Sequence, residues 1–325
     1  MPTRPPGGIR LFFVDNPRRH RYNKYNWILS TKSVDTMKKQ VEIMYKDEFE
    51  RWLAYPLDDP DLKPELESVA GDDEAVKDRF AVTLKFGTAG LRGVIGAGTN
   101  RMNVYVVRQA TQGLANWVKT QGGTQTVAIS YDSRIKSDVF AKAAAEVLAA
   151  NGVKVRIYKA LMPVPALSFA TRYYNCNAGI MVTASHNPAK YNGYKAYGSD
   201  GCQITSDMAD GITQEIKSLD IFSGVRRMDF EEGVKQGLIE YIGGETVDAF
   251  LDAVYQESLI DDASNLKLVY TPLNGAGKTC VLRILERIGI RDVTVVPEQA
   301  EPDGNFPTCP YPNPEFREAL QKGLE

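Results

Sequence analysis

Short strand-like runs alternate with helical segments along residues 126–184, and this alternation constrains the fold more than any other feature of the chain. The runs TVAISYD, VKVRIYK and AGIMVTA each predict a strand, and AGIMVTA is apolar enough for a buried one. Residues 137–150 and 163–174, which separate these runs, predict helices. Strands and helices that alternate in this way form α/β domains with a mixed or parallel sheet.

The pattern continues on both sides of this region. The chain predicts, in order, a helix over 38–54, a strand over 80–86, a glycine-rich loop over 87–103, and helices over 104–119 and 205–219. A second α/β unit begins near residue 240, with helices expected over 246–256, 277–288 and 314–323 and strands over 266–272 and 292–297. A length of 325 residues suggests about two domains. We place them at 37–235 and 236–325, because a polar stretch lies around the boundary.

Residues 1–36 differ from the rest of the chain, since they are rich in Pro, Arg and Asn and have no clear period. We expect a disordered or misassigned leader, because the run is short and no helical face organises its charges. The alternative is a basic arm that binds nucleic acid or directs targeting.

Composition excludes several classes of protein. The formal net charge is −2, so bulk charge predicts no nucleic-acid partner. No apolar run approaches the roughly 18 residues of a transmembrane helix, so no membrane partner is expected. The four cysteines are scattered and only two histidines occur, which argues against a zinc site. Without a signal peptide, the cysteines are expected to be reduced thiols of a cytoplasmic protein.

The string TASHNPAKYNGYKAYG, residues 183–198, is the most specific motif in the chain. Ser185 follows a predicted buried strand and lies on a loop stiffened by Pro188, and Lys195 comes ten residues later, after an Asn-Gly turn. A hydroxyl at the end of a strand is well placed to meet a ligand. The same residue types also dominate ordinary turns, so a bare Ser-His-Asn-Pro is compatible with a structural turn.

A second motif, FGTAGLRG at residues 86–93, combines a glycine-rich turn with an arginine. Such a turn after a strand can bring backbone N–H groups close to a phosphate. The planar guanidinium of Arg92 suits phosphate oxygens. On its own, the string could equally be a tight connection.

Two weaker strings need separate interpretation. In YDSR, Asp132 and Arg134 end a strand, and they could act electrostatically near the serine or form a structural ion pair. The string NGAGKT, residues 274–279, resembles the end of a nucleotide-binding P-loop, but Pro272 stands where the first glycine is required. An ATPase is therefore excluded.

Together, the serine and arginine motifs resemble those of the α-D-phosphohexomutases, which include phosphoglucomutases, phosphomannomutases and phosphopentomutases. The Thr-Ala-Gly-Leu form is closest to the phosphoglucomutase/phosphopentomutase branch. The resemblance implies mixed-sheet α/β/α domains, one complete and one partial. It also implies an isomerase of carbohydrate metabolism. Such an enzyme moves a phosphoryl group between the 1- and 6-positions of a sugar monophosphate (the 5-position in pentoses) through a phosphoserine and a sugar bisphosphate.

The same resemblance assigns roles to residues. Ser185 would carry the phosphoryl group and give an oxygen ligand to Mg²⁺, and Lys195 would be a general acid/base if its pKa is lowered. Arg92 would balance the charge of the phosphoserine. His186 would contact phosphate or substrate, and its alternative role is to stabilise the turn. The residues expected to bind substrate or phosphate are Thr88, Arg92, Asn187 and Arg134.

The family binds Mg²⁺ through a D-x-D-x-D-R loop, and no such string occurs in this chain. Residues 301–316 resemble the stretch that precedes that loop. The resemblance covers nearly all of residues 38–325 but only the first half of a family member, so we expect a truncated mutase with little activity alone. Mg²⁺ and a sugar bisphosphate activator are implied for the full-length family. A non-catalytic binding or regulatory protein derived from the same fold is the alternative. The sugar and the oligomeric state stay open.

Overall fold

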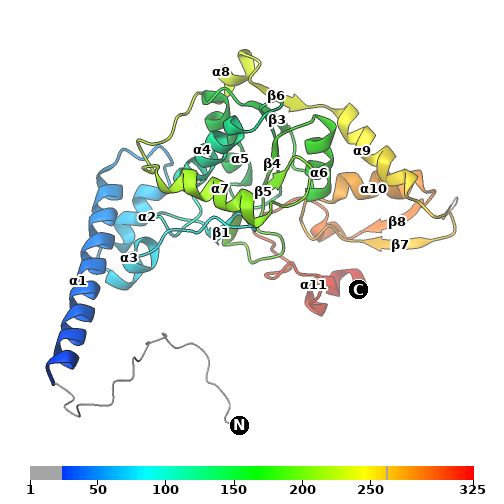
Figure 1. Ribbon diagram of the computed structural model, residues 1–325. Helices are drawn as coiled ribbons and strands as arrows, with labels where there is room; N and C mark the ends of the chain where they lie inside the picture. Colours follow the sequence, from blue (N-terminus) through cyan, green and yellow to red (C-terminus); the bar gives the residue numbers. More distant parts are fainter. Residues whose placement is uncertain (1–23, 261–262) are drawn as a thin grey trace, which may run out of the picture. The chain divides into compact units, whose positions relative to one another are not determined.

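The computed structural model describes residues 24–260 and 263–325 (Figure 1). The chain divides into two compact units, residues 1–44 and 45–325, and the candidate site lies in the second. Helix α1 (Lys24–Ala54) includes the helix predicted over 38–54 and begins earlier. The expected leader lies outside the described residues as far as residue 23.

A mixed six-stranded sheet is the centre of the second unit (Figure 1). Its strand order is β1-β5-β4-β2-β3-β6, in which β2, β3, β4 and β6 are parallel and β5 is antiparallel to both β1 and β4. The strands are β1 (Leu91–Val94), β2 (Thr126–Tyr131), β3 (Lys154–Tyr158), β4 (Ala178–Val182), β5 (Tyr191–Gly198) and β6 (Ile239–Ile242). The predicted mixed α/β class is confirmed.

Helices cover both faces of this sheet. Val127 and Ile129 of β2 belong to the main core, to which the helices α4 and α5 contribute, whereas the intervening Ala128 packs with Leu167 of α6. This alternation is the two-residue period of a strand buried on both sides. The predicted helices are confirmed as α4 (Val104–Thr120), α5 (Ser137–Ala150), α6 (Val164–Tyr173) and α7 (Ser206–Lys217).

An additional helical layer, absent from the sequence predictions, precedes the sheet. It contains α2 (Leu62–Val69) and α3 (Asp73–Phe80). The predicted strand over 80–86 is wrong, because Phe80 ends α3 and its ring packs edge-on against Trp52 at 5.8 Å between centroids. Strand β1 lies instead within the predicted glycine-rich loop, where Leu91 pairs with Tyr194 of β5.

The carboxyl-terminal part contains a smaller parallel sheet, in which β7 (Lys267–Tyr270) pairs with β8 (Asp292–Val295). The remaining elements are α8 (Phe230–Lys235), α9 (Gly244–Gln256), α10 (Lys278–Arg287), the 3₁₀ turn η1 (Pro297–Gln299) and α11 (Arg317–Leu324). The division at 235/236 stays a prediction, and β6 lies beyond it in the chain yet pairs with β3. Within residues 24–260 and 263–325, no helix combines the length and apolar character needed to cross a bilayer.

Candidate active site

The loop between β4 and β5, residues 183–190, presents Ser185 and is called the serine loop below. Ser185 adopts a left-handed backbone with φ of +56°, which is uncommon for a residue other than glycine. Its N–H donates to Oγ1 of Thr183 at 2.9 Å, and its carbonyl accepts from Arg134 at 2.7 Å. The side chains of Ser185 and His186 are exposed. The loop therefore fixes the serine backbone and leaves the hydroxyl accessible.

The loop between β2 and α5, residues 132–136, is hydrogen-bonded to the serine loop and is called the support loop. The guanidinium of Arg134 is fully buried, and its terminal N–H groups donate to the carbonyls of the serine loop and the start of β5. These four acceptors are the carbonyl oxygens of Ser185, Asn187, Pro188 and Tyr191. This arrangement favours the structural expectation for Arg134, while a phosphate contact stays a prediction.

Asp132 is the carboxylate partner within the support loop. It accepts hydrogen bonds from the hydroxyls of Thr183 and Ser137 and from the N–H of Arg134. Burial raises the pKa of Asp132, although these three donors act in the opposite direction. Nε of Arg134 lies 3.5 Å from its carboxylate. This buried ion pair lies within the support loop, and the hydrogen bond from Thr183 connects it to the end of β4.

Asn187 is also engaged within the serine loop. Its side-chain amide donates to the carbonyl of Ala184 at 3.0 Å, and its backbone N–H donates to the same carbonyl at 3.1 Å. This amide closes the turn that carries the exposed serine. The predicted substrate contact of Asn187 is not tested by this geometry and stays a prediction.

Arg92 and Lys195 lie on neighbouring strands, and their side chains are on the same face of the sheet. Arg92 on β1 is opposite Gly193, and Lys195, two residues further along β5, is opposite Met181 of β4. Burial and the positive charge of Arg92 lower the pKa of Lys195, and Asp132 opposes this shift. This shift is in the direction that the predicted proton-transfer role of Lys195 would need.

The glycine motif explains how β1 reaches β5. Gly87 and Gly90 exchange backbone hydrogen bonds of 3.1 and 2.7 Å, which close a tight turn with the exposed Thr88 at its tip. Gly90 has a φ of +71°, and a Cβ there would lie 1.9 Å from the carbonyl oxygen of Tyr194. The carbonyl of Thr88 accepts from Gln203 at 2.8 Å. Only glycine permits this close approach beside Lys195.

A cavity of about 380 Å³ opens beside the serine loop. Ser185 and His186 line it, together with four residues of the loop over 272–276, which are Pro272, Leu273, Gly275 and Ala276. Arg92, Lys195, Thr88 and Asn187 are not among its lining residues. Sequence reasoning missed residues 272–276, although they overlap the set-aside NGAGKT string, because their place at this cavity depends on packing between distant segments.

The residues present do not complete a magnesium site. Among the described residues, no group of three His, Cys, Asp or Glu side chains is placed to hold a metal ion. Asp132 lines the cavity, but its oxygens already accept three hydrogen bonds. The predicted Ser185 ligand would therefore supply one oxygen without the carboxylates that Mg²⁺ prefers.

Comparison with known proteins supports the family resemblance of the serine and arginine motifs. The family description "Phosphoglucomutase/phosphomannomutase, alpha/beta/alpha domain I" matches residues 83–221, and the corresponding description of domain II matches residues 248–325. A phosphoglucomutase of Staphylococcus saprophyticus is 36% identical over 248 residues, which cover 76% of this chain and 45% of that protein. A phosphoribomutase of Saccharomyces cerevisiae is 36% identical, over 76% of this chain and 42% of that protein.

Solved structures show the same likeness. A phosphoglucomutase/phosphomannomutase family protein from Burkholderia thailandensis superposes with a TM-score of 0.57 and 26% identity, over 73% of this chain and 48% of that one. The chain spans about half the length of the curated relatives it matches.

Proposed function

The chain belongs to the phosphoglucomutase/phosphomannomutase family, and from this premise we propose that it takes part in sugar phosphate isomerisation with Ser185 as the phosphoryl carrier. The observation that carries the proposal is the geometry of Ser185. Its backbone is fixed by Thr183 and Arg134, and its exposed side chain lines the cavity. The names of the relatives, phosphoglucomutase and phosphoribomutase, support a hexose or pentose monophosphate as substrate.

The proposed reaction consists of two phosphoryl transfers. In the first, the bond between phosphorus and the Ser185 oxygen breaks as a bond to a free sugar hydroxyl forms. That hydroxyl loses its proton to a base, and the departing serine oxygen takes up a proton. The product is a sugar bisphosphate. After the bisphosphate reorients, the serine hydroxyl loses its proton as its oxygen attacks the other phosphorus. The sugar oxygen released from that phosphorus takes up a proton, which restores the phosphoserine and gives the isomeric monophosphate. Positioning of the two oxygens in line supplies much of the rate acceleration.

Lys195 and Arg92 are our candidates for the proton and charge requirements of these transfers. A neutral Lys195 amine can accept the hydroxyl proton, and the lowered pKa of Lys195 increases the share of neutral amine at a given pH. The guanidinium of Arg92 can offset phosphate charge. Thr88 and His186 are also our candidates for contacts with phosphate, because both residues are exposed and His186 lines the cavity.

We further propose that residues 1–325 alone turn over little substrate. The described residues lack a carboxylate set for Mg²⁺, and the chain covers 45% of the matched phosphoglucomutase. A cytoplasmic location is proposed because all four cysteines are free thiols.

The test separates phosphoryl transfer to the serine from turnover. Purified residues 1–325 are incubated with glucose 1,6-bisphosphate, and phosphoserine is measured by intact-protein mass spectrometry while isomerisation of glucose 1-phosphate is followed in parallel. We expect phosphorylation that Ser185→Ala abolishes and that Ser133→Ala, a second serine lining the cavity, leaves in place. Turnover at ordinary enzyme rates would contradict the low activity proposed for this chain. Sugar phosphate binding without phosphorylation would favour a non-catalytic binding protein.

A further inference from the structure

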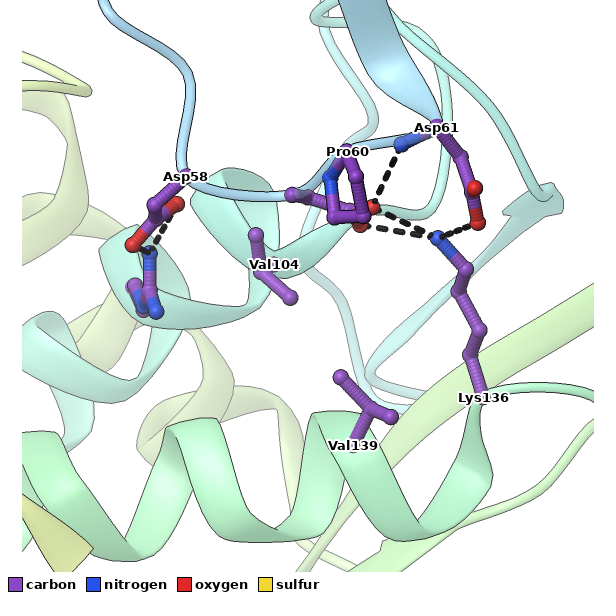
Figure 2. Close-up of a pocket in the computed structure, with 8 residues that line it drawn as sticks. Asp58, Pro60, Asp61, Val104, Lys136 and Val139 are labelled. Carbon is purple, nitrogen blue, oxygen red and sulfur yellow. Dashed lines mark hydrogen bonds and ion pairs between the residues drawn. The ribbon is translucent and has the colours of Figure 1, made fainter.

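A short acidic turn over residues 58–61 contacts the support loop from outside the region that matches the family. Nζ of Lys136 lies 2.9 Å from both carboxylate oxygens of Asp59 and 2.8 Å from an oxygen of Asp61. Figure 2 shows the side chain of Lys136 extending from the start of α5 toward Asp61. The acidic turn precedes segment 83–221, which matches domain I of the family.

The Lys136 contact is partly shielded from water. The side chain of Asp59 is 6% exposed and that of Lys136 is 18% exposed. Burial opposes the charged ammonium, but the hydrogen bonds from Lys136 to Asp59 and Asp61 outweigh it and raise the pKa of Lys136. The lysine is therefore charged at neutral pH, and it cannot leave Asp59 without stranding a buried carboxylate.

The backbone of Lys136 also needs external support. Its φ of +61° is left-handed, a conformation that non-glycine residues keep only where surrounding contacts enforce it. A cavity of about 310 Å³ adjoins the pair and is lined by Val104 and Val139 as well as the acidic turn (Figure 2). Because Lys136 borders a cavity there, side-chain packing cannot hold it in place of its ionic contact with Asp59.

The other side of the support loop reaches the serine loop and β5. Two residues before Lys136, Arg134 donates to the carbonyl of Ser185. On either side of Lys136, the carbonyl of Ile135 and the hydroxyl of Ser137 both accept from the buried amide of Asn192, each at 3.0 Å. A shift of the backbone at Lys136 would move all of these partners together.

We propose that Lys136 is a positioning residue, which anchors the support loop to the acidic turn and thereby fixes the serine loop that presents Ser185. The segment before the family match is then part of the scaffold of the site. The predicted effect on the order of the serine loop holds whether or not Ser185 is phosphorylated. The predicted effect on phosphorylation rests on the function proposed above.

Hydrogen–deuterium exchange on residues 1–325 tests this directly. In Lys136→Met, we expect amides of residues 183–192 to exchange roughly tenfold faster, while amides of α4 keep their protection. Lys136→Arg, which keeps the charge, should restore slow exchange. The control is Lys235→Met, since Nζ of Lys235 contacts Glu232 only at 3.9 Å on an exposed surface. If Lys136→Met does not fold, Asp61→Asn gives a milder version, because Asp61 is 69% exposed.

Two outcomes would overturn the inference. One is unchanged exchange over residues 183–192 in both Lys136→Met and Asp61→Asn. The other is faster exchange of equal size in α4, which would make Lys136 a residue of general stability. The phosphorylation rate is measured in parallel, and Lys136→Met should slow it while Lys136→Arg recovers it. A wild-type chain that is never phosphorylated would contradict the proposed function and leave the exchange result to decide this one.

Discussion

Gly90→Ala should separate β1 from β5 at the point where Lys195 lies. The new Cβ would stand 1.9 Å from the carbonyl oxygen of Tyr194 and 2.9 Å from Cα of Lys195, and neither backbone atom can rotate away. The left-handed backbone, with φ of +71°, costs alanine about 1–2 kcal/mol. Overpacking adds about 1–3 kcal/mol, so the free energy of unfolding should fall by about 2–5 kcal/mol.

The assay is urea unfolding of the wild-type chain and the variant, with the midpoint and slope of each transition compared. Gly87→Ala is a matched control in the same turn, because a Cβ added at Gly87 would meet nothing within 4 Å and the φ of Gly87 is not positive. We expect Gly87→Ala to stay within about 1 kcal/mol of wild type. Equal stability of the two variants would refute the close approach of β1 to β5.

Three further predictions concern the serine loop, Lys195 and the helical layer. Arg134→Met should lower the free energy of unfolding by about 3–5 kcal/mol in urea titrations, because it leaves Asp132 buried without its cation; a loss below about 1 kcal/mol would contradict this. Arg92→Ala should raise the pKa of Lys195, since a neighbouring positive charge is removed, so that amine labelling of Lys195 requires higher pH than in wild type; an unchanged labelling profile would argue against their proximity. Trp52→Ala should lower the free energy of unfolding by about 3–5 kcal/mol in the same urea titrations, because the indole is fully buried among Phe80, Tyr105 and Phe222. An unchanged free energy of unfolding would mean that residues 45–82 are dispensable for the core.

Periodicity predicted the elements whose burial follows from their own sequence. β4 is buried at every position, and its sequence AGIMV is a continuous apolar run. α5 begins and ends where predicted, at Ser137 and Ala150. These elements carry their pattern locally, so the α/β fold class could be predicted from the sequence.

The errors arose where distant contacts decide the local structure. Residues 80–86 alternate like a strand, but packing of Phe80 on Trp52 ends a helix there instead. β1 exists because Gly90 allows contact with β5, about a hundred residues away in the chain, and no local period reports such pairing. The sequence predicts only a polar stretch around the 235/236 boundary, yet Ile239–Ile242, just after it, forms the edge strand β6 beside β3.

The site shows the same division. Ser185, Lys195 and Arg92 could be selected from motifs, because their residue types and spacing are specific. The hydrogen bonds of Arg134 to four carbonyls could not be predicted, since they depend on how two loops meet at the carboxyl ends of β2 and β4. The same reason applies to residues 272–276 and to the contact between Lys136 and Asp59.

The most direct test of the central proposal is to locate the phosphoryl group after the chain has been exposed to glucose 1,6-bisphosphate. Peptide mass spectrometry over residues 178–198 should find one phosphoryl group, on Ser185, with none on the peptide from Ser185→Ala. A folded wild-type chain that stays unphosphorylated, or that carries the group on Ser133 instead, would contradict Ser185 as the phosphoryl carrier.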